Sequence, residues 1–193
     1  MITSIVTPPA AEPVLIAALK SHMNIDSSFT DDDSYIETLQ VVARRHVENI
    51  TRRKLITQTW KLFLQGWPPE NYITLPFGQL QSVAHLKYTD SNEDQSTFDS
   101  DDYSVDTDSD PGRVVLDYGK SWDGGTLWPL NPLELQFVTG YGAAGSDVPD
   151  EILMAIKLLV SELYERREMN IVGVGVQLLD MLSNLLASYR LWY

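Results

Sequence analysis

Residues 31–64, DDDSYIETLQVVARRHVENITRRKLITQTWKLFL, contain the change of hydrophobic period that decides the fold. The first part predicts an amphipathic helix, because apolar side chains recur every three or four residues, at Ile36, Leu39, Ala43, Val47 and Ile50. Aspartates at positions 31–33 suit the positive end of its dipole. From 56 to 64 the side chains alternate, with Trp60, Leu62 and Leu64 on one face, and predict a strand. The chain therefore passes from helix to strand near residue 55.

Shorter segments on both sides of this stretch complete the expected order of elements. Residues 1–9 are predicted to form an extended arm, since Pro8 and Pro9 disfavour helix before them, and residues 13–23 a short helix. Alternating runs between turn residues predict strands at 72–75, 80–88, 103–105, 113–116 and 133–139. Helical periodicity returns after Pro149, with Asp147 as the expected N-cap, and a last helix is expected from 176 to about 189.

This order of helices, strands and helices predicts an α+β fold. The expected architecture is a mainly α-helical bundle of about four helices, with an antiparallel β-module inserted between the second and third helices. Residues 1–54 would supply the N-terminal arm and the first two helices, and residues 55–146 the β-module with its acidic loop. Residues 147–193 would supply the last two helices and the C-terminal tail.

The composition of the 193 residues excludes several classes of function. The chain has no cysteine, which excludes disulfides, thiolate metal sites and thiol nucleophiles. Its net charge of −13 opposes sequence-independent binding to DNA, which depends on Lys and Arg contacts with phosphates. No segment has the features of a signal peptide or approaches the ~18 apolar residues of a membrane span, so we expect a cytoplasmic protein with no membrane partner.

One glycine-rich segment imitates a nucleotide-binding motif. Gly140-Tyr-Gly142-Ala-Ala-Gly145 has the G-x-G-x-x-G spacing that lets backbone approach a pyrophosphate at a helix N-terminus. The helix, however, cannot begin before about Pro149, and Asp147, Asp150 and Glu151 place negative charge where the phosphate would lie. We favour a flexible strand-to-helix loop over a nucleotide-dependent enzyme.

An acidic segment offers a second possible ligand site. Residues 89–110 contain nine acids and no base, and Asp106-x-Asp108-x-Asp110 has the opening spacing of a calcium loop. Pro111 stands where such a loop needs glycine, so a solvated acidic hairpin is the favoured interpretation, with a calcium-stabilised adhesion or tail module as the alternative function.

The histidines and serines predict no active site. His22, His46 and His85 lie on three different elements without metal-binding spacing, and no G-x-S-x-G segment is present. His46 falls on the apolar stripe of the helix that begins near residue 31, where we expect a hydrogen-bonded core imidazole. The sequence therefore predicts neither catalytic residues nor a metal or cofactor.

Two clusters are candidates for protein–protein contacts. The first is basic and lies at the end of the long helix: Arg44, Arg45, Arg52, Arg53 and Lys54. It either complements the helix dipole in solvent or pairs with acids of a neighbouring subunit. The second is the tail, Tyr189, Arg190, Leu191, Trp192 and Tyr193, whose residue types are enriched at binding hot spots. The tail either packs on its own bundle or docks on a partner.

A series of short segments in the same order resembles the head–tail connector (adaptor, or head-completion) proteins of tailed bacteriophages. The resemblance spans nearly the whole chain, although the first helix is less charged and residues 89–110 more acidic than is usual there. The segments are Met23-Asn-Ile-Asp26, Asp31-Asp32-Asp33, residues 47–60, Leu75-Pro76, residues 80–83, Tyr103-x-Val-Asp106, Pro111-Gly-Arg-Val114, residues 118–122, residues 137–142, Val148-Pro149 and Leu163-Tyr-Glu-Arg166.

The resemblance implies a structural, non-catalytic role in the neck of the virion. Such a protein would be made in the host cytoplasm and assemble into a ring, probably of twelve copies, below the portal protein. The ring would join the portal to a stopper or tail-completion protein, and genomic DNA would pass through without specific binding. The tail residues 189–193 would dock on the portal, and the basic cluster would lie between subunits.

Overall fold

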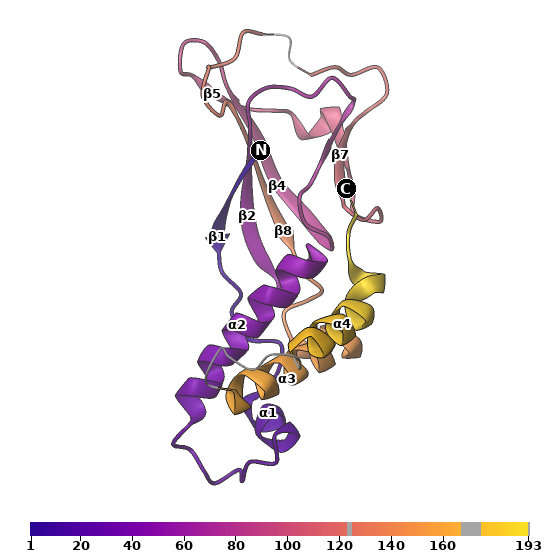
Figure 1. The fold of residues 1–193 in the computed structure, drawn as a ribbon. Helices are drawn as coiled ribbons and strands as arrows, with labels where there is room; N and C mark the ends of the chain where they lie inside the picture. Colours follow the sequence, from indigo (N-terminus) through magenta and orange to yellow (C-terminus); the bar gives the residue numbers. More distant parts are fainter. Residues whose placement is uncertain (123–124, 167–174, 193) are drawn as a thin grey trace. The chain divides into compact units, whose positions relative to one another are not determined.

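The computed structural model describes residues 1–122, 125–166 and 175–192, with only the backbone of residues 175–180. The chain forms two compact units (Figure 1). We call the first, Met1–Pro9 with Thr57–Gly140, the sheet unit, and the second, Ala10–Ile56 with Tyr141–Tyr193, the helical unit. The combination of helices with antiparallel sheets confirms the predicted α+β class.

The sheet unit consists of two antiparallel sheets. The larger has the order β1 (Ile2–Thr7), β2 (Gln58–Leu64), β8 (Leu133–Thr139), β4 (Leu80–Thr89) and β5 (Gln95–Thr97). The smaller has the order β3 (Tyr72–Thr74), β7 (Arg113–Leu116) and β6 (Tyr103–Asp106). Side chains of both sheets share one core, in which Leu62, Val114 and Phe137 are fully buried. The strict alternation of buried and half-buried residues in β8 explains why its strand was readable from the sequence.

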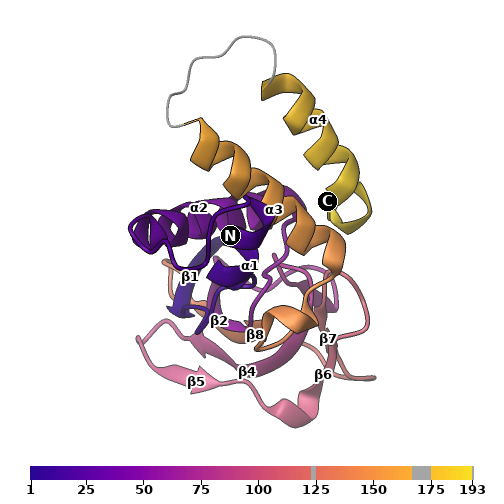
Figure 2. The same ribbon diagram turned by 90° about the horizontal axis from the view of Figure 1, so that it is seen from below.

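The helical unit contains α1 (Ile16–His22), α2 (Asp33–Thr51), α3 (Asp150–Glu165) and α4 (Gly175–Leu186). Figure 2 shows α3 between α2 and α4, and α3 contacts both of them. The core of the helical unit is formed by the buried stripes of α2 and α3, which include Ile36, Val47, Ile152 and Ile156. None of the helices in the described parts of the chain is both long and apolar enough to cross a membrane.

Several local predictions need correction. Residues 1–9, predicted as an arm of the bundle unit, contain β1, which pairs with β2 because its backbone completes the edge of the sheet. The short strand β5 was not predicted. Asp147 does not cap α3, which begins at Asp150; its carboxylate accepts from the Ala144 N–H at 3.0 Å, within the turn that precedes α3. His46, expected in the core, is exposed on α2.

A buried carboxylate fixes the way in which the chain leaves α2. Glu48 is 4% exposed, and its Oε1 accepts from Arg44 Nη1 at 3.3 Å and from the Leu55 N–H at 3.2 Å. Lys54 Nζ donates to Oε2 at 3.4 Å, and Arg44 also binds Glu12, with Nε 2.7 Å from Oε2. Burial lowers the pKa of Lys54. Burial also acts to lower the pKa of Arg44, but the hydrogen bonds and charges of Glu12 and Glu48 together outweigh it and raise that pKa. Two buried cations therefore depend on this carboxylate.

A second carboxylate closes the β6–β7 hairpin of the sheet unit. Asp106 accepts from the Ser109 hydroxyl at 2.6 Å and the Ser109 N–H at 2.9 Å, and Arg113 Nη2 lies 2.7 Å from Oδ2. These bonds, with the Ser109 hydroxyl first and Arg113 next, hold the pKa of Asp106 well below its ordinary 3.8. The first aspartate of the calcium-like spacing is thus a structural residue of the turn.

We expect Glu48→Gln to destabilise the helical unit by about 3–5 kcal/mol, because it removes the buried negative charge that Lys54 and Arg44 share and leaves only the half-buried Glu12 beside Arg44. Chemical denaturation followed by circular dichroism measures the change. Glu37→Gln, the same substitution at an exposed position of α2, is the matched control and should change stability by less than about 0.5 kcal/mol. Equal stability of the two variants would contradict the role assigned to Glu48.

We expect the Asp106 carboxyl to titrate below pH 3.8 in the folded protein. We expect its titration midpoint to rise in both Ser109→Ala and Arg113→Ala, because each substitution removes a donor to the carboxylate. Because the folded-state pKa is lowered, the ionised Asp106 stabilises the folded protein, and this contribution is fully present above the unfolded-state pKa. It is lost as the pH falls through the lowered value. A carboxyl-detected NMR titration measures the midpoint. A midpoint at or above 3.8 in the native chain, or no response to either substitution, would refute the assignment.

Candidate functional site

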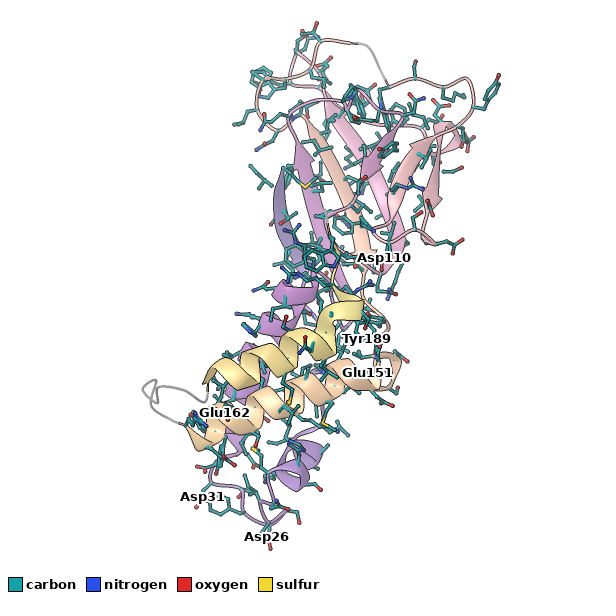
Figure 3. The ribbon with its side chains drawn as sticks, turned by 45° about the vertical axis from the view of Figure 1, so that its right-hand side comes forward. Asp26, Asp31, Asp110, Glu151, Glu162 and Tyr189 are labelled. Atoms are coloured by element: carbon teal, nitrogen blue, oxygen red, sulfur yellow. The ribbon has the colours of Figure 1, made fainter. Side chains whose placement is uncertain are left out.

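The C-terminal tail returns to the end of α2. The buried Leu191 donates its N–H to the Thr51 carbonyl at 3.1 Å, and Arg53 Nε donates to the carbonyl of Tyr189. The Tyr189 hydroxyl donates to Glu151 Oε2 at 2.8 Å, and this bond raises the pKa of Tyr189; the two residues are labelled close together in Figure 3. Tyr189 and Leu191 therefore anchor the tail on its own helical unit.

The residues around this anchor point outward. Trp192 is 75% exposed, and the Arg190 guanidinium carbon lies 4.3 Å from the centroid of its ring. A guanidinium stacked on an indole forms a preorganised pair of the two residue types most typical of binding hot spots. In the predicted tail cluster, Tyr189 and Leu191 thus pack on the helical unit, whereas Arg190 and Trp192 are exposed. Tyr193 lies outside the described residues.

The predicted basic cluster also divides. Arg44, Arg53 and Lys54 are 5–7% exposed and bind groups of their own helical unit, so they cannot reach a neighbouring subunit. Arg44 and Lys54 are buried because they neutralise the buried Glu48, and Arg53 because it donates to the carbonyl of Tyr189. Arg45 and Arg52 are exposed. The predicted inter-subunit role is therefore narrowed to these two residues and stays a prediction.

The glycine motif serves packing rather than phosphate binding. A Cβ added at Gly142 would lie 2.1 Å from Asp147 Oδ2, and one at Gly145 would lie 1.9 Å from the Pro13 carbonyl oxygen. A carboxylate thus fills the space that a pyrophosphate would need, with Asp150 and Glu151 exposed nearby. The geometry argues against the nucleotide-dependent enzyme and explains the glycines by the close approach of neighbouring chain segments.

Neither the acidic segment nor the histidines form a metal centre in the part of the chain that the structure describes. No group of three acidic or histidine side chains there could hold a metal ion. Asp106 is committed to Ser109 and Arg113, which removes the first ligand of the calcium-like spacing. His85 Nε2 lies 3.1 Å from Glu134 Oε1, which also forms an ion pair with Lys61. All three residues belong to strands of the larger sheet.

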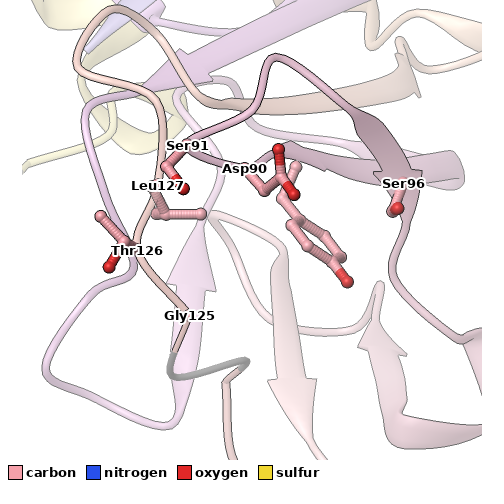
Figure 4. A pocket seen from close by; sticks show the side chains of 7 residues that line it. Asp90, Ser91, Ser96, Gly125, Thr126 and Leu127 are labelled. Carbon is pink, nitrogen blue, oxygen red and sulfur yellow. The ribbon is translucent and has the colours of Figure 1, made fainter.

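Two surface hollows were not foreseen from the sequence. One, of about 300 Å³, is lined by hydroxyl groups and by Asp90 (Figure 4), whose carboxylate accepts from the N–H groups of Asn92 and Asp94. These bonds hold the Asp90 carboxylate within its own turn and lower its pKa. The other, of about 400 Å³, is mostly apolar and lies between the start of α1 and α3, near the exposed Leu15. Neither brings nucleophile, base and acceptor groups together.

The exposed apolar residues of the helical unit were also missed. Val42 on α2 is 50% exposed, and Met154 on α3 is 44% exposed. The apolar residues of α2 and α3 that the sequence pattern singled out belong to the buried stripes, and single exposed residues beside such a stripe carry no periodic signal of their own. Only the position of the neighbouring helices shows that these side chains face solvent.

Known structures share this fold over its whole length. A chain from the neck of an empty gene transfer agent (GTA) particle, computed with C6 symmetry, matches with a TM-score of 0.79 at 22% identity, over 100% of this chain and 97% of that chain. A chain from the virion of a native GTA particle gives 0.79 at 20% identity, and one from the neck of a native GTA particle, computed with C12 symmetry, gives 0.76 at 20% identity, both with the same coverage. A comparison with curated proteins found no match.

The sequence itself matches a protein family. The family of phage gp6-like head-tail connector proteins matches residues 14–113, which include α1, α2 and the strands from β2 to β6. This match agrees with the resemblance found in the short ordered segments. The chain therefore belongs to the phage gp6-like head-tail connector family, and its role is that of a structural connector.

Proposed function

We propose that about twelve copies of this protein form a ring in the neck of the virion, directly below the portal. The ring would join the portal protein to a stopper or tail-completion protein, after synthesis of the chain in the host cytoplasm. The observation that carries this proposal is the family match combined with a full-length fold match to a chain of a particle neck computed with C12 symmetry. A closed ring needs heterologous contacts, in which two different faces of one chain meet.

The charge of the chain suits a passage for DNA. A net charge of −13 repels the phosphates of a duplex, so DNA would slide through a ring of such subunits without binding. The burial of basic side chains strengthens this effect, because Lys20, Arg44, Arg53 and Lys54 are all less than 8% exposed. The surface that faces solvent is therefore more acidic than the sequence composition indicates.

The exposed end of the tail is the proposed contact with the portal. Leu191 and Tyr189 hold the last turn on the helical unit, which presents Arg190 and Trp192 in a fixed arrangement. Anchoring of this kind reduces the conformational entropy lost when the pair enters a partner's pocket. Trp192 would fill an apolar pocket of the portal, and Arg190 would meet acceptors at its rim.

Assembly on heads tests the ring directly. Purified protein is mixed with DNA-filled, tailless heads of the same phage, and the portal vertex is imaged by electron cryomicroscopy. We expect new ring density below the portal, with a symmetry that gives the number of copies. Intact heads that gain no density at the portal vertex would overturn the proposed function.

Substitution of the tail tests the docking contact. We expect Trp192→Ala to weaken binding to heads about 30-fold or more, because truncation of an aromatic hot spot typically costs at least about 2 kcal/mol. Sedimentation of heads with bound protein measures the affinity. Tyr118→Ala, which removes another fully exposed aromatic ring, is the matched control and should bind like the native chain. Equal binding by both variants would contradict docking through Trp192.

A further inference from the structure

The outward side of α2 carries an acid, an apolar pair and a base, in that order along the chain. Glu37 and Arg45 are exposed, and Val41 and the 50% exposed Val42 lie between them. Glu37, Val41 and Arg45 follow each other at steps of four residues, so they lie along one side of the helix. Within the described residues, Arg45 forms no ion pair. This stripe has the mixture of apolar centre and charged ends that is typical of an interface rim and core.

The outward side of α3 has the same order. Asp150 is exposed in its first turn, Met154 is 44% exposed one turn later, and Lys157 follows, half-buried. Steps of four and three residues place these side chains on one side of α3. No ion pair of Asp150 or Lys157 is formed within the described residues. The acidic end also includes Glu151, whose carboxylate accepts from Tyr189.

The two stripes cannot meet within one chain. The side of α2 that packs in the core is formed by its buried residues, among them Ile36 and Val47, and α3 lies against that side. Val42 and Arg45 lie on the opposite side of α2 from these buried residues and therefore face away from α3, and α3 separates α2 from α4 (Figure 2). The complement of each stripe has to come from a second molecule.

Two stripes of the same order are complementary when their helices run antiparallel. With Val42 opposite Met154, Arg45 comes beside Asp150 and Glu37 beside Lys157. At a rise of about 1.5 Å per residue, the corresponding charges differ in axial position by no more than about 3 Å, which long side chains can span. A parallel arrangement would instead place acid beside acid and base beside base.

We propose that α2 of one copy packs antiparallel on α3 of the next copy in the ring, with the apolar pair Val41 and Val42 against Met154 between the ion pairs Arg45–Asp150 and Glu37–Lys157. The proposal rests on the ring of the proposed function and identifies the two faces that meet. Because the faces differ, the contact is heterologous and repeats from copy to copy until the ring closes. A contact between two such stripes is small beside the ~1,600 Å² of a stable complex, so we expect the ring to form on the portal rather than in free solution.

The absence of cysteine makes cross-linking a direct test of this contact. The double variant Val42→Cys/Met154→Cys is assembled on tailless heads and treated with a short bismaleimide. We expect a ladder of cross-linked species that extends to the closed ring, since every copy carries both halves of the contact. The matched control is Val42→Cys/Met181→Cys, because Met181 on α4 is 44% exposed, like Met154. This control should bind heads but give no ladder.

Charge reversal provides a second, independent readout. We expect Arg45→Glu to reduce the protein bound per head at least about tenfold, because it places like charges at every contact of the ring. Asp150→Arg in the same chain should restore binding, since it rebuilds the ion pair with reversed polarity. Circular dichroism of the free variants shows that each is folded.

The outcomes separate this inference from the function on which it rests. Heads that bind no native chain overturn the proposed ring, and the inference with it. Native rings that give no ladder through positions 42 and 154, or a ladder equal to that of the Met181 control, overturn the α2–α3 contact alone. Loss of binding in Arg45→Glu without recovery in the double variant overturns the pairing of Arg45 with Asp150.

Discussion

The buried carboxylate of Glu48 is the constraint on which the helical unit depends. A buried charge is tolerated only when opposite charges and hydrogen-bond donors surround it, and Glu48 receives donors from Arg44, Lys54 and the backbone of Leu55. Arg44 in turn holds Glu12, in the segment that precedes α1. One carboxylate thus links the start of the unit, the middle of α2 and the segment that leaves α2. The chain direction after residue 52 is set by these bonds, together with the left-handed backbone of Arg52.

The same end of α2 also determines what the tail presents. The Thr51 carbonyl accepts from Leu191, and Arg53 donates to the carbonyl of Tyr189, so the tail is attached next to the Glu48 network. Arg190, between these two anchors, is left outside and stacks on Trp192. The Arg190–Trp192 pair is therefore held in place by the rest of the tail. Its position follows from hydrogen bonds made by a helix terminus, whose last carbonyls have no partner within the helix.

The sequence predicted those elements whose burial pattern is local. The stripes of α2 and α3 and the alternation in β2 and β8 all follow from which face of one segment is apolar, and a single chain segment contains that information. β1 was missed because its pairing with β2 joins distant residues, from Ile2 with Phe63 to Thr7 with Thr59, and its own side chains are mostly exposed. β5 was missed because three exposed polar residues form it only through pairing with β4.

The exposure of the candidate contact residues was predicted in part, for the same physical reason. Residue type alone indicated Arg190 and Trp192, and their exposure agrees with that choice. In the basic cluster, however, residue type could not distinguish Arg44 from Arg45, since the difference lies in Glu12, 32 residues away, and in the orientation of α2. Only the packing of the helices shows that Arg45 is exposed and available for contacts while Arg44 is buried.

The excess of acids on the surface limits where two copies of the chain can approach each other favourably. Four basic side chains are buried, whereas Glu48 is the one buried acid among the residues whose burial is described. On a surface so dominated by acids, an exposed Arg45 beside Val42 is a rare feature, and an approaching copy is repelled wherever acids face acids. A neighbour gains attraction only where its own acid meets such a base. In the proposed ring, unfavourable contacts elsewhere would then select the register in which Arg45 faces Asp150, in the way that like charges exclude wrong partners in other assemblies.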